Sequence, residues 1–284
     1  MSTLSYGAAA VLGVVEGLTE FLPVSSTAHL TIAEKALGYK VDDSAITAYT
    51  AIIQLGAIAA TFVYFAKDIA RLFMAWVRGI RSSSERANHD YSLAWAVIVG
   101  SIPVALVGLL LKDVIEGPLR SLWVVAIALI VWSAAIVFAE RRHTTLEQHG
   151  TVRGEGAVTI RDGLMIGLTQ CISVIPGVSR SGATISAGLV RGLDRVTATR
   201  LSFFLAIPAL TAAGVFEAIT TDLSQLGGGQ MLVGIAVAFV VAYASIAWLL
   251  KFVAGHTLTS FVSYRVVLGV VLLVLLASGV MGAT

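Results

Sequence analysis

The chain has 284 residues, of which 57% are hydrophobic and only 13% charged, and its formal net charge is +2. This apolar composition excludes a soluble domain of this size and predicts an all-α integral membrane protein that crosses the bilayer several times. No run of Lys and Arg is interleaved with aromatic residues, which excludes nucleic acid as a partner, and the single cysteine excludes an internal disulfide and a cysteine-based metal cluster.

The first segment is predicted to be a broken helix. Residues 4–20 form one helix, which places Glu16 and Glu20, four residues apart, on one face. Pro23 interrupts it, and the serines that follow can cap a second helix. Each piece is too short to cross a bilayer, so we expect a re-entrant pair that enters and leaves on one side. No Lys or Arg precedes the apolar N-terminus, so we expect it to stay in the protein rather than act as a signal peptide.

Six apolar runs follow, each close to the roughly 20 residues that a ~30 Å hydrocarbon core requires. They occupy residues 44–66, 93–111, 119–139, 197–219, 230–252 and 259–281. Between the third and the fourth, two short helices are predicted at 158–174 and 179–191, separated by Pro176. The sequence therefore predicts six membrane-spanning helices and two re-entrant helix pairs.

The two broken helices resemble each other in sequence. Gly17-Leu-Thr-Glu20 precedes the first proline and Gly167-Leu-Thr-Gln170 precedes the second, and a Ser-rich helix start follows each proline. This order predicts an inverted-topology repeat, roughly 1–140 and 141–284, within a single membrane domain. Chance convergence of small-residue helices is the alternative.

Orientation follows from Lys and Arg, which concentrate in the segments 67–92 and 140–162. Both segments are therefore predicted to be cytoplasmic. Six spans then place both termini outside the cytoplasm. The first re-entrant pair enters from outside and the second from inside, so we expect their tips to meet near the midplane.

Two helix N-termini in one cavity form an anion site, because each carries unpaired N–H groups and about half a positive charge. The candidate phosphate-binding residues are Ser25, Ser26 and Thr27 at the first tip, and Ser179, Arg180, Ser181 and Thr184 at the second. They offer hydroxyl donors and one guanidinium suited to bidentate phosphate contact. Alternatively, the serines only cap their helices, and Arg180 forms an ion pair that ties the two halves together.

Glu16 and Glu20 would repel an anion. Two facing carboxylates beside a phosphate site indicate either a bound divalent cation, Mg²⁺ or Ca²⁺, or a general base. Neutralisation of Arg180 is an alternative that explains one glutamate but not both. His29, three residues after Ser26, lies on the same helix face and is a candidate proton carrier; the alternative is a hydrogen-bonded packing residue.

Two further polar residues lie inside predicted spans. Gln54 either reaches the cavity or makes an interhelical hydrogen bond. Arg265 either pairs with another group or lines the cavity, and the sequence does not decide between these interpretations.

Two stretches carry a family resemblance: Glu16-Gly-Leu-Thr-Glu-Phe-Leu-Pro-Val-Ser-Ser-Thr-Ala-His29 and Pro176-Gly-Val-Ser-Arg-Ser-Gly-Ala-Thr184. The chain closely resembles the undecaprenyl-diphosphate phosphatases of the bacitracin-resistance family over almost its whole length. Ala28 stands where the family usually has glycine, a small-for-small change. The resemblance implies a bacterial inner-membrane enzyme with an outward-opening site, which converts a C55 polyprenyl diphosphate, released by peptidoglycan polymerisation, into the monophosphate carrier and inorganic phosphate. The family's functional residues would fall on Glu16, Glu20, Ser26, Thr27, His29, Ser179, Arg180 and Thr184.

The resulting hypothesis is a membrane diphosphatase. Arg180 and the tip hydroxyls bind the phosphates; Glu16 and Glu20 hold a divalent cation or activate the nucleophile. His29 handles a proton, and the attacking group is either water or Ser26. The alternative function is a transporter or flippase of the phosphorylated polyprenyl carrier, because inverted repeats with broken helices are typical of alternating access. An intramembrane serine protease is disfavoured, because no Gly-x-Ser-Gly elbow occurs. The preferred prenyl length and the oligomeric state stay open, with a homodimer as one alternative.

Overall fold

The computed structural model describes residues 4–39, 44–111, 114–115, 119, 121–220 and 227–282. These residues form α-helices joined by turns and 3₁₀ helices, with no β-strand among them. In chain order the α-helices are α1 (Tyr6–Thr19), α2 (Ser26–Ala36), α3 (Ser44–Tyr64), α4 (Ala66–Arg81), α5 (His89–Leu110), α7 (Leu122–Gln148), α8 (Ile160–Gln170), α9 (Arg180–Val190), α10 (Arg195–Thr220), α11 (Gly228–Val253) and α12 (Val262–Ala277). The predicted all-α fold is confirmed; residue 120 of the third predicted span lies outside the described residues.

In the part of the chain that the structure describes, six helices are long and apolar enough to cross a membrane, which confirms the six predicted spans. They are α3, α5, α7, α10, α11 and, together with the 3₁₀ turn before it, α12. The largest difference from the prediction concerns α7, which continues to Gln148 instead of ending near residue 139. The polar residues beyond 139 include neither Gly nor Pro, so nothing in the sequence stops the helix there.

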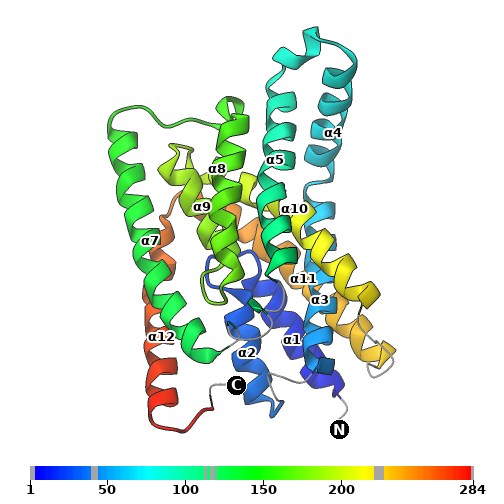
Figure 1. Cartoon of the computed structure of the whole chain (residues 1–284), viewed down its shortest axis with the longest axis vertical. Coiled ribbons are helices and arrows are strands. Elements are labelled where there is room, and N and C mark those ends of the chain that lie inside the picture. The colour runs from blue at the N-terminus through cyan, green and yellow to red at the C-terminus, as the bar shows by residue number, and fades with distance from the viewer. Residues whose placement is uncertain are drawn as a thin grey trace.

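Helix α4 lies in the segment 67–92, which the sequence predicts only as a cytoplasmic connection. Its apolar residues recur with helical spacing, and Leu72, Ala75 and Gly79 are buried. Tyr91 of α5 packs on Gly79. As a result, α4 and the first part of α5 run side by side and project beyond the other helices (Figure 1).

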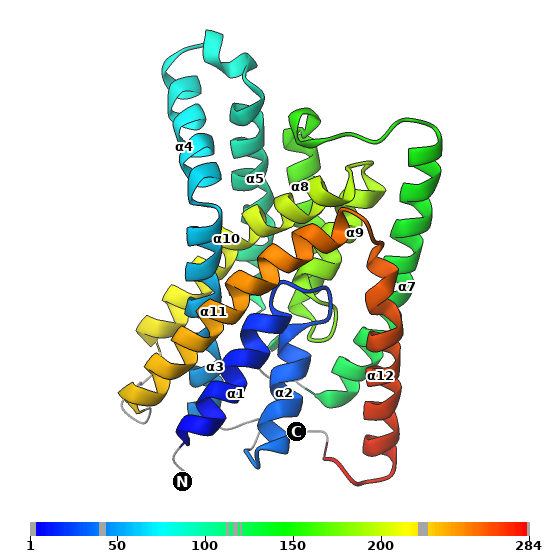
Figure 2. The same ribbon diagram turned by 180° about the vertical axis from the view of Figure 1, so that it is seen from behind.

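Two helix hairpins face each other inside the bundle. Helices α1 and α2 form the first, and α8 and α9 form the second. The first hairpin starts from the end of the molecule that carries both termini and the second from the opposite end, so their turns meet in the middle (Figures 1 and 2). Both breaks fall where the sequence predicts them. The second turn is longer, because the 3₁₀ helix η4 (Cys171–Val174) precedes Pro176.

The first helix of each hairpin packs on a spanning helix from the other half of the chain. A Cβ added at Gly17 of α1 would lie 2.7 Å from the carbonyl oxygen of Ala238 in α11. Gly167 of α8 is pressed in the same way against the backbone of Gly100 in α5. Only glycine permits backbones to approach this closely. Each hairpin is therefore fixed by a helix from the opposite half.

The second helix of each hairpin begins at a strained serine. Ser25 and Ser179 are the only non-glycine residues with positive φ in the described part of the chain, and φ is 77° at both. Each serine is the N-cap of its helix, and its Oγ accepts a hydrogen bond from a backbone N–H, that of Ala28 or Gly182. A left-handed φ at a residue with a Cβ costs on the order of 1–3 kcal/mol. Both turns thus use the same costly backbone geometry.

Candidate active site

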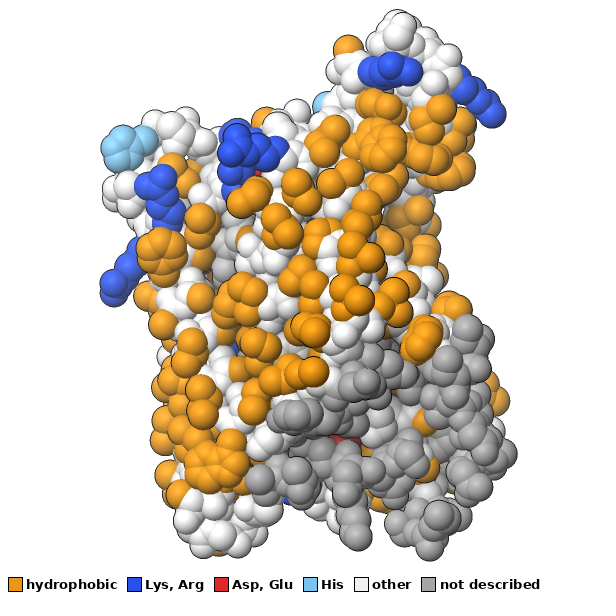
Figure 3. All heavy atoms as spheres, in the orientation of Figure 1, with side chains coloured by type: hydrophobic (Ala, Val, Ile, Leu, Met, Phe, Trp, Pro, Cys, Tyr) orange, Lys and Arg blue, Asp and Glu red, His pale blue; other side chains and the backbone are white. Residues whose placement is uncertain are grey.

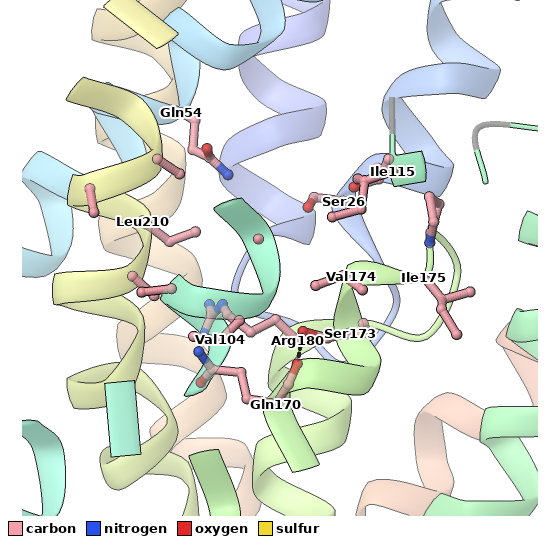
Figure 4. A pocket seen from close by; sticks show the side chains of 18 of the residues that line it. Ser26, Gln54, Val104, Ile115, Gln170, Ser173, Val174, Ile175, Arg180 and Leu210 are labelled. Carbon is pink, nitrogen blue, oxygen red and sulfur yellow. Dashed lines mark hydrogen bonds between the residues drawn. The ribbon is translucent and has the colours of Figure 1, made fainter. Parts of the chain in front are cut away.

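A pocket of about 570 Å³ lies where the two hairpin turns meet, and residues of α3, α5 and α10 complete its walls (Figure 4). Its polar lining consists of Glu20, Ser25, Ser26, Thr27, Gln54, Gln170, Ser173, Ser179 and Arg180. Its apolar lining includes Val104 and Leu109 of α5 and Leu210 and Phe216 of α10. These apolar residues belong to those halves of α5 and α10 that lie nearer to the end of the molecule with the two chain termini (Figure 1). A polar floor with an apolar approach suits an amphiphilic ligand with a polar head and an apolar tail.

Glu20, Ser26 and Arg180 form the centre of this pocket. The Ser26 hydroxyl donates to Oε2 of Glu20 at 2.6 Å, and Nη2 of Arg180 lies 3.4 Å from Oε1 of the same carboxylate. The predicted ion pair between the two halves therefore exists, between Arg180 and Glu20. A carboxylate that accepts a hydrogen bond from a serine hydroxyl is placed to take up its proton, as a general base does for a nucleophile.

The guanidinium of Arg180 is only loosely bound within the protein. Nη1 donates to the carbonyl of Ser202 at 3.2 Å, the contacts with Glu20 are 3.4 Å or longer, and Nε has no partner. Its side chain is nevertheless largely buried. A buried guanidinium with unused donors can bind a phosphate at a low cost in reorganisation.

Glu16 lies one helical turn before Glu20 and is almost fully buried, but it is not among the residues that line the pocket. Its Oε1 has no hydrogen-bond partner among the described residues. No group of three or more His, Cys, Asp or Glu side chains lies close enough to hold a metal ion within the described residues. Glu16 and Glu20 thus offer a two-carboxylate set, which fits a divalent cation when substrate phosphate completes the coordination.

The two capping serines hold the turns together. Ser25 Oγ accepts a hydrogen bond from the backbone N–H of Gly177 at 3.2 Å. The hydroxyl of Ser179 donates to the carbonyl of Leu22 at 3.5 Å. Ser181 donates to the same Leu22 carbonyl at 2.8 Å. Ser25 and Ser179 therefore cap their helices and also line the pocket, so capping does not exclude the predicted contact with phosphate.

The other predicted phosphate-binding residues divide into two groups. Thr27 is exposed and lines the pocket. Ser181 and Thr184 are fully buried and are not part of the lining. The Thr184 hydroxyl donates to Ser202 Oγ at 2.6 Å, which ties α9 to α10 behind Arg180. The structure brings Ser181 and Thr184 next to the site without directing them into it.

His29 faces away from the pocket. Its Nδ1 donates to the carbonyl of Ser25 at 2.7 Å, and because a carbonyl only accepts, the neutral ring carries its proton there. Nε2 then accepts from the hydroxyl of Tyr264 at 2.5 Å, and the two rings are stacked. Both ring nitrogens are occupied, which matches the packing alternative more closely than proton transfer in the pocket.

Arg265 resolves the question that the sequence leaves open. Its side chain is fully buried, and its guanidinium donates to the carbonyls of Pro23 at 3.0 Å and Gly177 at 2.9 Å, as well as to Val178 and Ser133. It pairs with no carboxylate among the described residues and does not line the pocket. Arg265 instead bridges the backbones of both turns.

Sequence reasoning gave no catalytic-site role to Gln170 or Ser173, although both line the pocket. Gln170 appears in the sequence as the counterpart of Glu20 in the repeated motif, and that match was the available signal. Ser173 has no comparable signal. Gln54 does reach the cavity (Figure 4), which decides between its two interpretations.

Ion pairs link the connections at the end opposite the termini. Arg71 of α4 pairs with Asp68, Asp90 and Glu155, and Arg200 of α10 pairs with Asp68 and Glu155 at 2.9 and 2.6 Å. We call these five residues the loop-end cluster. It joins α4, α5 and α10 to the connection between α7 and α8.

A second group of ion pairs lies at the start of α8. Burial alone would raise the pKa of Asp162, but hydrogen bonds from Arg153, Thr159 and Arg191 outweigh it and hold that pKa well below its usual range. The same carboxylate completes a capping box with Thr159. Asp162 therefore fixes the entry of the second hairpin.

Comparison with known proteins shows what this architecture belongs to. The sequence model of the family described as bacitracin resistance protein BacA matches residues 9–271. The chain is 54% identical to undecaprenyl-diphosphatase 1 of Streptomyces coelicolor over 284 residues, which cover 99% of both chains. It is 53% identical to undecaprenyl-diphosphatase 3 of Frankia casuarinae, over 97% of this chain and 98% of that one. The chain belongs to the BacA family of bacitracin resistance proteins.

Proposed function

We propose that this chain hydrolyses undecaprenyl diphosphate to undecaprenyl phosphate and inorganic phosphate, and so recycles the lipid carrier for cell-wall synthesis. Family membership and the activity named for its relatives support this assignment. The observation that carries it to a particular site is the contact between Ser26 and Glu20 at 2.6 Å, beside a guanidinium with free donors.

The positive groups of the pocket attract the negatively charged diphosphate. Arg180 donates to phosphate oxygens, and the N-termini of α2 and α9 add their unpaired N–H groups and partial positive charge. Ser26 and Thr27 supply hydroxyl donors. The apolar walls from α5 and α10 receive the first part of the prenyl chain. The reacting phosphate is thereby held next to Ser26.

The contact between Ser26 and Glu20 favours Ser26 over water as the attacking group. Glu20 accepts the hydroxyl proton while Ser26 Oγ forms a bond to the terminal phosphorus, and the bond from that phosphorus to the bridging oxygen breaks. Undecaprenyl phosphate leaves. Water then attacks the phosphoserine and the bond from Ser26 Oγ to phosphorus breaks; Glu20 returns its proton to Ser26 Oγ, and the water oxygen and its protons leave with the inorganic phosphate. Arg180 stabilises the negative charge in both steps.

Glu16 and Glu20 are the residues that would hold a divalent cation, together with substrate phosphate. Such an ion supplies neutralisation of the phosphate charge. The unpartnered, buried Oε1 of Glu16 supports this assignment. Either Mg²⁺ or Ca²⁺ suits carboxylate oxygens. For His29, the contacts with Ser25 and Tyr264 support a role in positioning the first turn.

The membrane placement of the site belongs to the same proposal: the bacterial inner membrane, with the pocket open to the extracytoplasmic side and both hairpins re-entrant. Figure 3 supports it, because hydrophobic side chains cover most of the visible body, while most visible Lys and Arg lie near the end opposite the termini. Lys and Arg favour the cytoplasmic side. The equivalent packing of α1 on α11 and of α8 on α5 supports an inverted repeat of the two halves.

Phosphate release by the purified protein tests the activity. Polyprenyl diphosphates of graded length are incubated in detergent, with and without a chelator. We expect release that depends on the cation and is abolished in Glu20→Ala. Detergent abolishes any gradient, so a protein that only transports the lipid would release nothing, and that outcome would contradict hydrolysis. Release that is unchanged by the chelator would exclude the cation but leave the hydrolase.

A further inference from the structure

We propose that the side-chain amide of Gln170 is a further substrate-binding group, which donates from Nε2 to an oxygen of the diphosphate. This inference rests on the proposed function and deepens it, because it names a contact that neither the family motifs nor the repeat assigns to this residue. Gln170 is the last residue of α8 and lines the pocket. Figure 4 shows its side chain pointing into the pocket from α8, as that of Arg180 does from α9.

The amide of Gln170 is buried without a partner. Its residue is 0% exposed, and neither Nε2 nor Oε1 has a hydrogen bond among the described residues. Buried polar groups in proteins are almost always bonded, and an exception calls for a ligand or a function. Three other buried polar side chains near the two turns do have protein partners, namely Ser181, Thr184 and Arg265.

A second unpartnered donor lies in the same pocket. Nε of Arg180 is also buried without a hydrogen bond. Two unused N–H donors on neighbouring helices of one hairpin require a ligand with several acceptors. The diphosphate group of a prenyl diphosphate offers five non-bridging oxygens and no obligatory donor, so it can bind both groups at once.

The repeat explains why this position carries an amide. Gln170 corresponds to Glu20 in the matched motif, and Glu20 already receives hydrogen bonds from Ser26 and Arg180. A second carboxylate in the pocket would repel the phosphates and compete for the guanidinium. An amide of the same shape removes the charge and adds two donors. The backbone carbonyl of Gln170 also accepts from the Ser173 hydroxyl at 2.6 Å, which holds the end of α8 in place.

Two variants test this contact. Gln170→Met removes the donors at similar volume, and Gln170→Glu replaces the amide by a charge. Gln148→Glu, at the exposed end of α7, makes the same chemical change away from the pocket and serves as the control. Binding of the non-hydrolysable probe methylenediphosphonate is measured by calorimetry and by the rise in the temperature of thermal unfolding, next to steady-state phosphate release.

We expect Gln170→Met to weaken binding of the probe about 10-fold, the value of one hydrogen bond to a charged group, and to raise KM for the lipid substrate accordingly. The ligand-free variant should unfold at the temperature of the wild type or above it. Gln170→Glu should weaken binding more than Gln170→Met does, and Gln148→Glu should match the wild type. Inorganic phosphate as a second probe separates the two sources of ligand: an equal loss for both probes assigns the contact to a single phosphate group, and a loss for the diphosphonate alone assigns it to the diphosphate.

Binding of both probes by Gln170→Met within twofold of the wild type would overturn the inference, whether or not Gln170→Glu folds. That result with normal hydrolysis leaves the proposed function intact. Conversely, a wild type that binds methylenediphosphonate but releases no phosphate from any prenyl diphosphate refutes the proposed function. In that case the loss of binding in Gln170→Met still decides the role of the amide.

Discussion

The two hairpins have the same backbone conformation at their turns but present different side chains. Both begin their second helix at a serine with φ of 77°, and both turns are held by Arg265. The residue after that serine is Ser26 in the first hairpin and Arg180 in the second. One copy of the same geometry therefore presents a hydroxyl beside a carboxylate, and the other presents a cation. The comparison teaches that the same strained turn presents a different side chain to the pocket in each hairpin, and under the proposed function this difference divides the work of phosphoryl transfer.

The hairpins also differ in the length of their turns. The 3₁₀ helix η4 lies between Gln170 and the second turn, and nothing equivalent separates Glu20 from the first. The longer turn adds Ser173 and Ile175 to the pocket lining. The second hairpin thus forms more of the cavity wall, while the first contributes the groups to which we assign the chemistry, Glu20 and Ser26.

The largest effect is expected when the second turn is made to resemble the first. Arg180→Ser places a hydroxyl at both tips and removes the cation that stabilises transferred charge, so phosphate release should fall about 10²–10³-fold. Arg161→Ser, at an exposed position of α8, is the matched control and should retain activity. Near-normal turnover of Arg180→Ser would refute the division of labour between the hairpins.

Removing the group that both hairpins share should destabilise the fold. Arg265→Ala leaves the carbonyls of Pro23, Gly177 and Val178 buried without donors, at a cost of about 3 kcal/mol in the free energy of unfolding or more. Thermal unfolding in detergent measures this, with the exposed Arg142→Ala as the control. Arg265→Lys keeps the positive charge but has fewer donors, so its unfolding temperature should lie between those of Arg265→Ala and the control. An unfolding temperature equal to that of the wild type would show that Arg265 does not hold the turns.

The second hairpin is expected to contribute a pH-dependent term to stability, because Asp162 anchors its entry. The pKa of this carboxyl is lowered in the folded state, so the charged form contributes stability above the unfolded pKa of about 4, and the contribution is lost as pH falls through the folded value. Asp162→Asn should cost about 2 kcal/mol at pH 7. The gap in unfolding temperature between wild type and variant should shrink below about pH 4. A gap that stays constant from pH 7 to about pH 2 would rule out the titration of Asp162 as its cause.

The smallest effects concern the strained serines. Ser25→Ala and Ser179→Ala lose the cap and keep the positive φ, whereas the glycine variants lose the cap and relieve the strain. We expect each glycine variant to be more stable than its alanine partner by about 1 kcal/mol, measured by thermal unfolding. The same sign at both positions would sharpen the parallel between the hairpins. Alanine variants as stable as the glycine variants would show that the turns are not strained.

Much of the fold could be predicted because it depends on local pattern. The six spans follow from apolar runs of membrane length, and both breaks follow from Pro23 and Pro176. Helix α4 could not be recognised as easily, because its basic residues indicated a connection more strongly than its amphipathic spacing indicated a helix. The end of α7 was also misplaced, because the fall in hydropathy near residue 139 marks the end of the apolar run and not the end of the helix, which continues to Gln148.

The site was predictable in its members but not in their orientations. Glu20, Ser26 and Arg180 meet as the broken helices imply. Side chains on one helix turn can still face in different directions, so nothing local shows that His29 turns toward Tyr264. The partners of Arg265 are backbone carbonyls of distant turns, which no pattern of side chains records. The unpartnered state of Gln170 is likewise a property of the packed structure.

The loop-end cluster bears on how substrate enters the pocket and how products leave it. Its paired charges close the bundle between α4, α5, α10 and the connection before α8, on the far side of the hairpins from the apolar walls of the pocket. The apolar lining of the pocket lies on the terminus-facing halves of α5 and α10, so we expect the diphosphate to enter and both products to leave past these two helices. Inorganic phosphate would then occupy the place of the next headgroup until it leaves. We therefore expect added inorganic phosphate to slow phosphate release from the lipid substrate.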